Sequence, residues 1–238
     1  MIDLHCHILP GLDDGAADDA VALAMCRMAA EDGIRTIVAT PHFDAALGVV
    51  DPERIAAAAE RFRGRIAEEG IDLELRHAAE VPLTEGAAEL YASGGWPAYD
   101  ERRRYVLLEM PPIRNGLAIL KETVFRLRMA GAVPVLAHPE RLEMLEERGS
   151  AEGLRNQGAV LQVTADCLVG PNTPARRRAV EWTKRGWVQA VATDAHDATR
   201  RVPRLSAARR WLEEQFGEAA AEELTCANPG KILKGEPL

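Results

Sequence analysis

Short apolar runs alternate with longer amphipathic segments along the chain. The short runs are rich in Val, Ile, Leu and Ala and show no regular alternation of polar and apolar residues, as expected when helices cover the faces of a sheet. They predict seven strands, at Ile2–Leu4, Thr36–Ala39, Leu73–Ala79, Tyr105–Glu109, Val133–Ala137, Val160–Val163 and Val188–Ala192.

The longer segments predict six helices, at Asp18–Asp32, Pro52–Glu69, Gly116–Ala130, Glu140–Glu147, Ala175–Arg185 and Arg204–Phe216. N-cap or first-turn positions suit Asp18, Asp51 and Asn115. A glycine follows four of the helices, as is common at helix C-termini: Gly33, Gly70, Gly131 and Gly186. Strands that alternate with helices predict an α/β protein with a largely parallel sheet.

The composition is that of one globular domain. No change of composition and no Pro/Gly/Ser-rich linker divides the 238 residues, so we expect a single domain over residues 1–238. The formal net charge of −8 argues against a nucleic-acid-binding protein, which usually needs a basic face. A phosphorylated substrate is compatible with this charge, because bound metal ions can reverse its local sign.

Targeting signals are absent from the sequence pattern. The first residues show no basic segment followed by an apolar one, and no stretch of 18 apolar residues occurs, so we expect neither a secretory signal nor direct membrane insertion. The four cysteines are far apart and form no C-x-x-C pair, which favours reduced thiols. The cytoplasm is therefore the expected location.

Side chains that can bind metal ions gather at the ends of the predicted strands. They include five of the six histidines and three carboxylates, namely His5, His7, His42, Glu80, Glu109, His138, Asp194 and His196. In a (β/α) barrel the C-terminal strand ends converge on one rim, whereas an open sheet spreads them along a line. The pattern therefore predicts a closed barrel around a metal cluster. Imidazoles and carboxylates together suit zinc, iron or manganese.

Local spacing supports this site. His5 and His7 are two positions apart, so both rings point to one side of an extended segment, and Asp194 and His196 repeat the spacing. The side chain between the first pair, Cys6, should point to the other face and occupy a small core position.

His77 is the exception among the histidines. It lies three residues before Glu80 and should face the opposite side of the third strand. We therefore assign it a structural role.

Adjacent acidic residues follow the two leading histidines. Asp13 and Asp14 stand before Gly15, a pattern that is more often a turn. Their closeness to the histidines makes at least one of them a candidate ligand, and spacing alone does not choose between them.

Two arginines lie just behind predicted ligands. Arg141 comes three residues after His138, and Arg201 comes five after His196. Either could be an ordinary surface residue, but planar guanidinium groups are also well suited to bind phosphate oxygens. The run Arg102–Arg104 precedes the fourth strand, at the opposite end of the predicted barrel, and is expected to be solvated surface.

Cysteine-based phosphatases are excluded by inspection. They need an arginine six residues after the nucleophilic cysteine, and the residues at that spacing from the four cysteines are Leu12, Asp32, Thr173 and Ile232.

The motifs extend over nearly the whole chain. They are Met1–Gly15, Thr40–His42, Glu80, Leu108–Glu109, Ala137–Arg141, Gln162–Ala165, Thr193–His196 and Asn228–Pro229. This set closely resembles that of bacterial protein-tyrosine phosphatases of the polymerase-and-histidinol-phosphatase (PHP) superfamily that are linked to capsule and exopolysaccharide synthesis.

The resemblance implies a distorted (β/α)7 TIM-like barrel and three divalent metal ions, often manganese. The family's ligand positions fall on His5, His7, Asp14, His42, Glu80, Glu109, His138, Asp194 and His196. The resemblance thus selects Asp14 over Asp13, and it implies that Arg141 and Arg201 bind phosphate. Two departures are minor: Cys6 stands where serine is common, and Asp197 stands where asparagine is common. The second adds negative charge near the expected phosphate pocket.

The resemblance also implies the reaction and the partner. The substrate would be phosphotyrosine, on the tyrosine-rich tail of a bacterial tyrosine autokinase. We hypothesise direct attack on phosphorus by a metal-activated hydroxide, with His42 as the candidate proton donor. Three divalent ions against four carboxylates leave roughly two positive charges, enough to hold a dianion.

Three other functions fit parts of the pattern. A small-molecule phosphatase, such as histidinol-phosphate phosphatase, would differ in its preferred substrate. A metal-dependent amidohydrolase or deoxyribonuclease on a related barrel usually holds one or two metal ions, so a third ion counts against it. A catalytically inactive metal-binding partner of the kinase would show no turnover of any phosphoester.

Overall fold

Eight parallel strands form two sheets in the computed structural model, which describes residues 1–44, 50–111, 116–147 and 149–238. The first sheet has the order β1-β2-β3, and the second has the order β4-β5-β6-β7-β8. Their bounds are β1 Ile2–Cys6, β2 Thr36–Ala39, β3 Glu74–His77, β4 Glu80–Pro82, β5 Tyr105–Glu109, β6 Val133–Ala137, β7 Val160–Thr164 and β8 Ala190–Ala192. The prediction of an α/β protein with parallel strands is confirmed.

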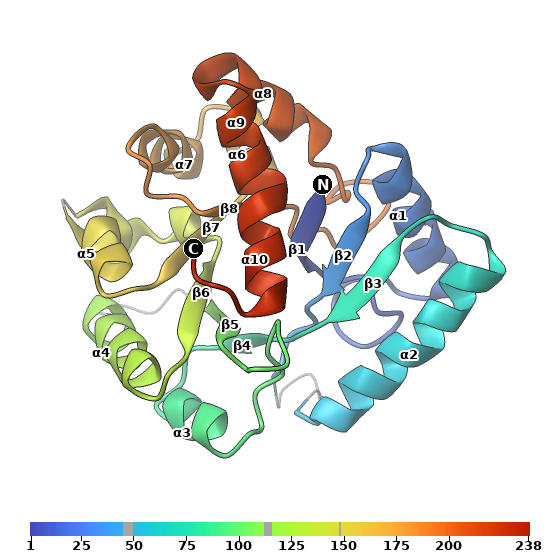
Figure 1. Ribbon diagram of the computed structural model, residues 1–238, viewed down its shortest axis with the longest axis horizontal. Coiled ribbons are helices and arrows are strands. Elements are labelled where there is room, and N and C mark those ends of the chain that lie inside the picture. Colours follow the sequence, from blue (N-terminus) through green and yellow to red (C-terminus); the bar gives the residue numbers. More distant parts are fainter. Residues whose placement is uncertain (45–49, 112–115, 148) are drawn as a thin grey trace.

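Isolated backbone bridges connect the two sheets at both edges. His42 pairs with Glu80 at one edge, and Cys6 pairs with Ala195 at the other. At the second edge the amide of His7 also donates to Ala195 O at 2.8 Å. Figure 1 shows the strands following one another around a central region in sequence order, with most helices outside them. The C-terminal ends of strands from both sheets are thereby brought together.

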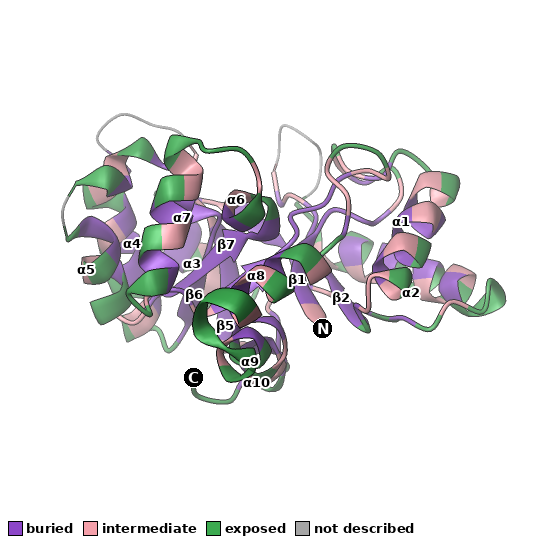
Figure 2. Cartoon of the chain, turned by 90° about the horizontal axis from the view of Figure 1, so that it is seen from above, coloured by how far each residue is buried: buried purple, intermediate pink, exposed green. Residues whose placement is uncertain are grey.

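Two apolar layers pack on the strands. The inner layer takes side chains from both sheets, including Leu4, Val38, Leu107 and Val135. The outer layer lies between the strands and the surrounding helices. Figure 2 shows the result: the strands are buried, and the helices expose their outer sides.

The helices within the described residues are α1 Asp19–Glu31, α2 Pro52–Glu68, α3 Ala87–Ala92, α4 Gly116–Met129, α5 Ser150–Asn156, α6 Ala165–Val169, α7 Pro174–Lys184, α8 Ser206–Phe216, α9 Glu218–Glu222 and α10 Asn228–Lys234, with short turns η2 Pro139–Arg141, η3 Glu143–Glu146 and η4 Glu223–Ala227. None of them has the length and apolar character needed to cross a bilayer.

Helix ends follow the sequence signals where these can be checked. The Asp18 side chain accepts from Val21 N and caps α1, and the Asp51 side chain accepts from Glu53 N and caps α2. The third predicted cap, Asn115, lies outside the described residues. All four glycines predicted to follow helices have positive φ: Gly33, Gly70, Gly131 and Gly186.

Helix α10 crosses the N-terminal ends of the strands (Figure 1). Its Asn228 side chain donates to Gln189 O, just before β8, at 3.0 Å. Ile232 and Leu233 from α10 complete the inner apolar layer. The C-terminal strand ends lie on the other side, where the predicted site residues are.

Two predictions about the elements were wrong. The predicted third strand, Leu73–Ala79, is present but shorter, as β3 Glu74–His77, and Glu80 begins β4 in the other sheet instead of ending that strand. The predicted helix Glu140–Glu147 consists of two short 3-10 turns, because Leu142 between them is extended. The sequence reading also missed several short helices, among them α3, α5 and α10.

Candidate metal centre

A bulge in β1 sets the direction of the first two histidines. The pairing of β1 with β2 shifts register between Asp3 and Cys6. Leu4 therefore packs in the inner layer, and Cys6 packs in the outer layer as predicted. His5 and His7 both point into the site, where their Nε2 atoms lie 3.2 Å apart.

The loop after β1 folds back onto His7. Ala16 N donates to His7 O at 3.0 Å. A side chain at Gly15 would not fit there, since a Cβ would lie 2.0 Å from His7 O. This tight return places Asp13 and Asp14 beside the histidines.

Four overlapping groups of potential ligand atoms lie in the site, each with its atoms within 4.8 Å of one another. They are His7, Asp14, His42 and His196; His5, Glu80 and His138; His5, His7 and Asp194; and His42, Glu80 and Glu109. All nine residues predicted as ligands occur in these groups. They come from β1, β4, β5 and the segments that follow β1, β2, β6 and β8.

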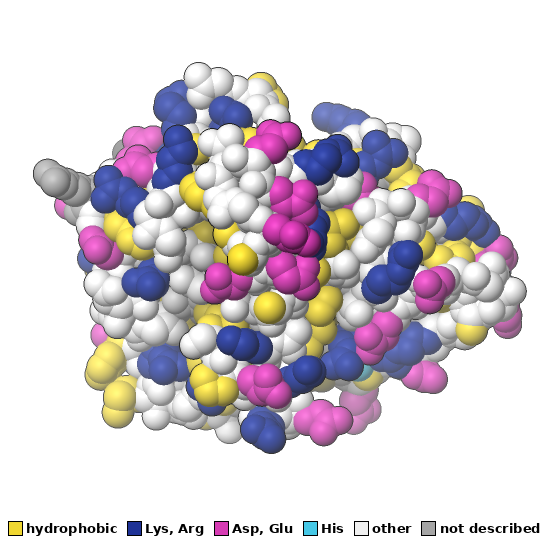
Figure 3. All heavy atoms as spheres, turned by 45° about the horizontal axis from the view of Figure 1, so that its top comes forward, with side chains coloured by type: hydrophobic (Ala, Val, Ile, Leu, Met, Phe, Trp, Pro, Cys, Tyr) yellow, Lys and Arg dark blue, Asp and Glu magenta, His cyan; other side chains and the backbone are white. Residues whose placement is uncertain are grey.

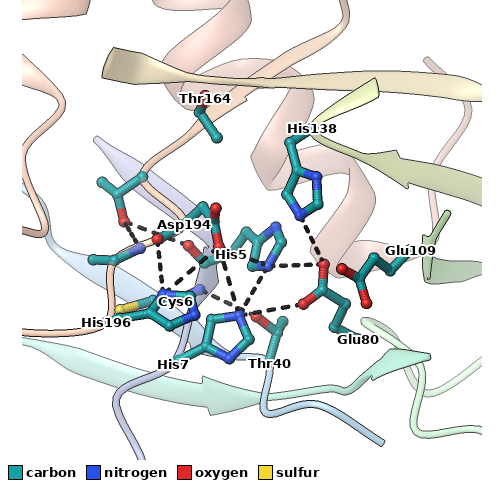
Figure 4. Close-up of polar contacts among 12 residues, drawn as sticks. His5, Cys6, His7, Thr40, Glu80, Glu109, His138, Thr164, Asp194 and His196 are labelled. Carbon is teal, nitrogen blue, oxygen red and sulfur yellow. Dashed lines mark hydrogen bonds and ion pairs between the residues drawn. The ribbon is translucent and has the colours of Figure 1, made fainter. Parts of the chain in front are cut away.

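Glu80 faces His5, His7 and His138 in the cluster (Figure 4). Its Oε1 is 3.3 Å from His5 Nε2 and 3.2 Å from His138 Nε2. Its Oε2 is 3.3 Å from His7 Nε2 and 3.2 Å from His42 Nδ1. The side chain is fully buried, and neither oxygen accepts a hydrogen bond from a donor of the described residues. A buried carboxylate of this kind needs cations for stability.

Asp194 forms the opposite side of the site. Its Oδ1 lies 3.4 Å from His5 Nε2, and its Oδ2 forms an ion pair with Arg141 Nη1 at 2.7 Å and accepts from Arg201 Nη2 at 2.6 Å. Asp194 and His138 both have positive φ, at 54° and 34°. Such strained conformations of non-glycine residues often occur at functional sites.

Buried acceptors orient the histidine rings. Asp13 Oδ2 lies 2.7 Å from His7 Nδ1, so Asp13 contacts the ring on the side away from Glu80. Asp14 instead belongs to a ligand group with His42. Gln162 Oε1, from β7, lies 2.9 Å from His5 Nδ1 and holds that ring in the same way.

The sequence reading did not identify Asp3 or Gln162 as site residues. Asp3 is fully buried and accepts from Thr193 N at 2.9 Å, from Thr193 Oγ1 and from His5 N, which links β1 to the segment that carries Asp194. The signal available was a polar residue inside an apolar strand, at both Asp3 and Gln162.

The carboxylates give the site a field that favours cations. Burial opposes the charged form of His7, but the nearby carboxylates of Asp13 and Glu80 outweigh it and raise the pKa of His7 to about 10. Despite full burial, the neighbouring histidines hold the pKa of Glu80 well below its usual range. His196 lies further from the carboxylates, and burial, helped by charge from His7 and Arg201, lowers its pKa to about 4.

Other predicted residues lie away from the cluster. His77 Nδ1 is 3.2 Å from Arg63 Nη2, so the ring faces helix α2, and it belongs to none of the ligand groups found among the described residues. Asp197 accepts from the backbone amides of Thr199 and Arg200 within its own loop. Its carboxylate is thus used to hold the loop.

The residues fit divalent metal ions. Each group combines imidazole nitrogens with carboxylate oxygens, a donor set suited to manganese, iron or zinc. The two oxygens of Glu80 accept no hydrogen bond from the described residues, and the Nε2 atoms of His5 and His7 face them, so these atoms are available as metal ligands. An arrangement of this kind can activate water and bind a phosphoryl group.

The capsular polysaccharide synthesis family CpsB/CapC has a sequence profile that matches residues 1–234. The chain belongs to this family. The resemblance predicted from its motifs is confirmed.

Individual relatives of this CpsB/CapC protein cover it from end to end. The tyrosine-protein phosphatase YwqE of Bacillus subtilis is 31% identical over 100% of this chain and 93% of its own. The tyrosine-protein phosphatase CpsB of Streptococcus pneumoniae is 28% identical over 98% of each chain. A crystal structure from work on these two proteins, which describes them as metal-dependent tyrosine phosphatases, matches with a TM-score of 0.91 at 29% identity, over 100% of this chain and 96% of that one.

Proposed function

We propose that this protein is a metal-dependent phosphatase that hydrolyses phosphotyrosine in proteins. The observation that carries the proposal is the buried carboxylate of Glu80, which faces four histidines and has no hydrogen-bond donor among the described residues. The tyrosine phosphatases YwqE and CpsB, which the chain resembles over its whole length, support the same reaction.

The nine predicted ligands would hold three divalent ions, with manganese as the first choice and iron or zinc as alternatives. The four overlapping donor groups would offer enough nitrogen and oxygen atoms to hold three ions. Four carboxylates, Asp14, Glu80, Glu109 and Asp194, then leave roughly two positive charges, which suits a phosphate dianion.

A distorted (β/α)7 barrel is the proposed architecture. Strands β3 and β4 together would count as one of its seven strands. The bridges at both sheet edges and the inner apolar layer support this description.

The residues of the chain have separate roles in the proposed reaction. The ions, when bound, supply Lewis-acid activation of water and neutralise charge on the phosphoryl oxygens. Arg141 and Arg201 would turn their guanidinium groups to the phosphoryl oxygens; both are about 40% exposed and already converge on one point, Asp194 Oδ2.

His42 is the proposed proton donor. Its side chain is 20% exposed, so a substrate can approach it, while its nitrogens face Asp14 and Glu80. A tyrosinate leaving group, with a pKa of about 10, needs little help from an acid. Loss of the acid should therefore matter less for phosphotyrosine than for an alkyl phosphate.

The proposed substrate is the phosphorylated tyrosine-rich tail of a bacterial autokinase, in the cytoplasm. The main alternative is a small-molecule phosphatase that acts on histidinol phosphate. Both can be tested together by measuring kcat/KM for a phosphotyrosine peptide and for histidinol phosphate with manganese-loaded protein. The proposal expects the peptide to be preferred. Preference for histidinol phosphate would contradict it, and hydrolysis of amides instead of phosphoesters would favour an amidohydrolase.

A further inference from the structure

A cavity lies on the side of the strands opposite the metal centre. It has a volume of about 520 Å³ and is lined by Tyr105, Val133 and Val160, the first residues of β5, β6 and β7. Gln189, just before β8, also lines it. Because the strands are parallel, this basal cavity lies at their N-terminal ends, whereas the metal centre lies at their C-terminal ends.

Four basic side chains from four segments surround the basal cavity. Arg104 precedes β5, Arg128 belongs to α4, Arg155 belongs to α5 and Lys231 belongs to α10. The only acidic side chain that lines it, within the described part of the chain, is Glu223. The side chains therefore give the cavity an excess of three positive charges.

This excess contrasts with the rest of the protein. The chain has 37 acidic and 29 basic residues, and on the face in Figure 3 the two kinds are interspersed. Arginines elsewhere, such as Arg27 and Arg126, form ion pairs with glutamates. Within the described ranges no ion pair involves any of the four basic residues of the cavity. Like charges held together without partners are unfavourable unless an anion joins them.

Two of the guanidinium groups lie against the protein: a hydrogen bond holds Arg128, and Arg104 lies over the ring of Tyr105, 5.8 Å from its centroid. The Arg128 side chain crosses the backbone at Gly158, where a Cβ would lie only 2.6 Å from Arg128 Nε, and its Nη1 donates to Ala132 O at 3.2 Å. The Nε of Arg104 is buried and has no hydrogen-bond partner among the described residues. The expectation that Arg104 is simply solvated surface was wrong. Prior ordering of such groups reduces the entropic cost of binding a ligand.

We propose that the basal cavity binds a small polyanion that carries two or more phosphate groups. Guanidinium groups match phosphate oxygens in shape and charge. The volume lies within the range of small-ligand sites, roughly 300–1,000 Å³. Arg104 and Arg155 contact the anion in this site, which is separate from the catalytic one.

Isothermal titration of manganese-loaded protein with methylenediphosphonate, a diphosphate analogue that phosphatases do not cleave, tests the proposal. We expect Arg104→Gln/Arg155→Gln to weaken binding of the analogue in the basal cavity by roughly tenfold or more, since two charge-assisted contacts are lost. A second pair, Arg155→Gln/Lys231→Gln, changes an exposed and a half-buried side chain and should act in the same direction, which guards against a folding defect of the first variant.

Two further variants locate the site. Arg27→Gln/Arg65→Gln removes the same charge from surface ion pairs elsewhere and should bind like the unchanged protein. Arg141→Ala/Arg201→Ala should still bind the analogue in the basal cavity. The two variants of that cavity, Arg104→Gln/Arg155→Gln and Arg155→Gln/Lys231→Gln, should keep phosphatase turnover. Unchanged binding in both basal variants, or loss of all binding in Arg141→Ala/Arg201→Ala, would overturn the proposal.

Discussion

Asp13 Oδ2 lies 2.7 Å from His7 Nδ1, on the side of the ring away from Glu80. The carboxylate also accepts from His42 N at 3.0 Å and from Gly15 N at 3.0 Å. Asp13 thus ties two predicted ligands, His7 and His42, and the loop after β1 into one arrangement. It positions His7 without belonging to a ligand group itself.

Asp13→Asn should lower metal affinity and kcat/KM by roughly 10–100-fold, because the carboxylate that orients His7 and raises its basicity is lost. Metal content measured by mass spectrometry after dialysis against limiting manganese would report the effect. Asp72→Asn, at a side chain that is 90% exposed, is the matched control and should change neither quantity. Wild-type metal content in Asp13→Asn would contradict this role.

Arg141→Ala and Arg201→Ala should each lower kcat/KM for a phosphotyrosine peptide by about 10²-fold while the metal content is kept, because each removes a donor to the developing phosphoryl charge. Steady-state kinetics and metal analysis on the same samples separate the two effects. Arg210→Ala, at an exposed arginine of α8, serves as the control. Normal turnover in both active-site variants would exclude phosphate binding by these residues.

Glu140 should contribute to stability. It is fully buried, and its Oε1 accepts from Thr164 N at 2.9 Å and from Thr164 Oγ1 at 2.7 Å. Glu140→Ala should lower the free energy of unfolding by roughly 1–3 kcal/mol, because both donors lose their partner. Urea denaturation measures this change, and Glu140→Gln should cost less because it keeps an acceptor. A loss no larger than that of the exposed neighbour Glu143→Ala would count against the contact.

His77 should make folding stability depend on pH. Burial, together with the positive charge of Arg63, lowers the pKa of His77 below 6.5. The unfolded chain then binds more protons than the folded one, so the contribution of His77 to stability rises as pH increases through the window below 6.5. With metal chelated, His77→Gln should therefore show a smaller gain in unfolding free energy from pH 5 to pH 7 than the unchanged protein. An equal gain would mean that the pKa of His77 is not lowered.

The sequence predicted those parts of the fold that depend on local pattern. Strands β2, β5 and β6 have the predicted bounds because their apolar runs end at clear polar residues. The break before Glu80 was not predictable, because it depends on pairing with β5 in a different sheet. The missed helix α10 is short, and its apolar residues are explained only by the inner layer that they complete.

The candidate site was predictable for a similar reason. Seven of its nine residues stand at or just after the C-terminal ends of strands, and parallel strands bring those ends together; the other two are Glu80, which begins β4, and Asp14, in the loop after β1. The supporting residues were harder to recognise. Asp3 and Gln162 act through partners 190 and 157 residues away, Thr193 and His5, and no local spacing indicates such contacts.

The central claim is that metal ions held around Glu80 drive phosphotyrosine hydrolysis. The most direct test is manganese-dependent phosphate release from a phosphotyrosine peptide, with metal-stripped protein and two matched variants. His138→Gln removes a nitrogen 3.2 Å from Glu80 Oε1, whereas His77→Gln changes a histidine that faces α2. We predict release that requires manganese, survives in His77→Gln and is abolished in His138→Gln. Release that persists without metal or in His138→Gln, or no release from folded, metal-loaded protein, would contradict the account.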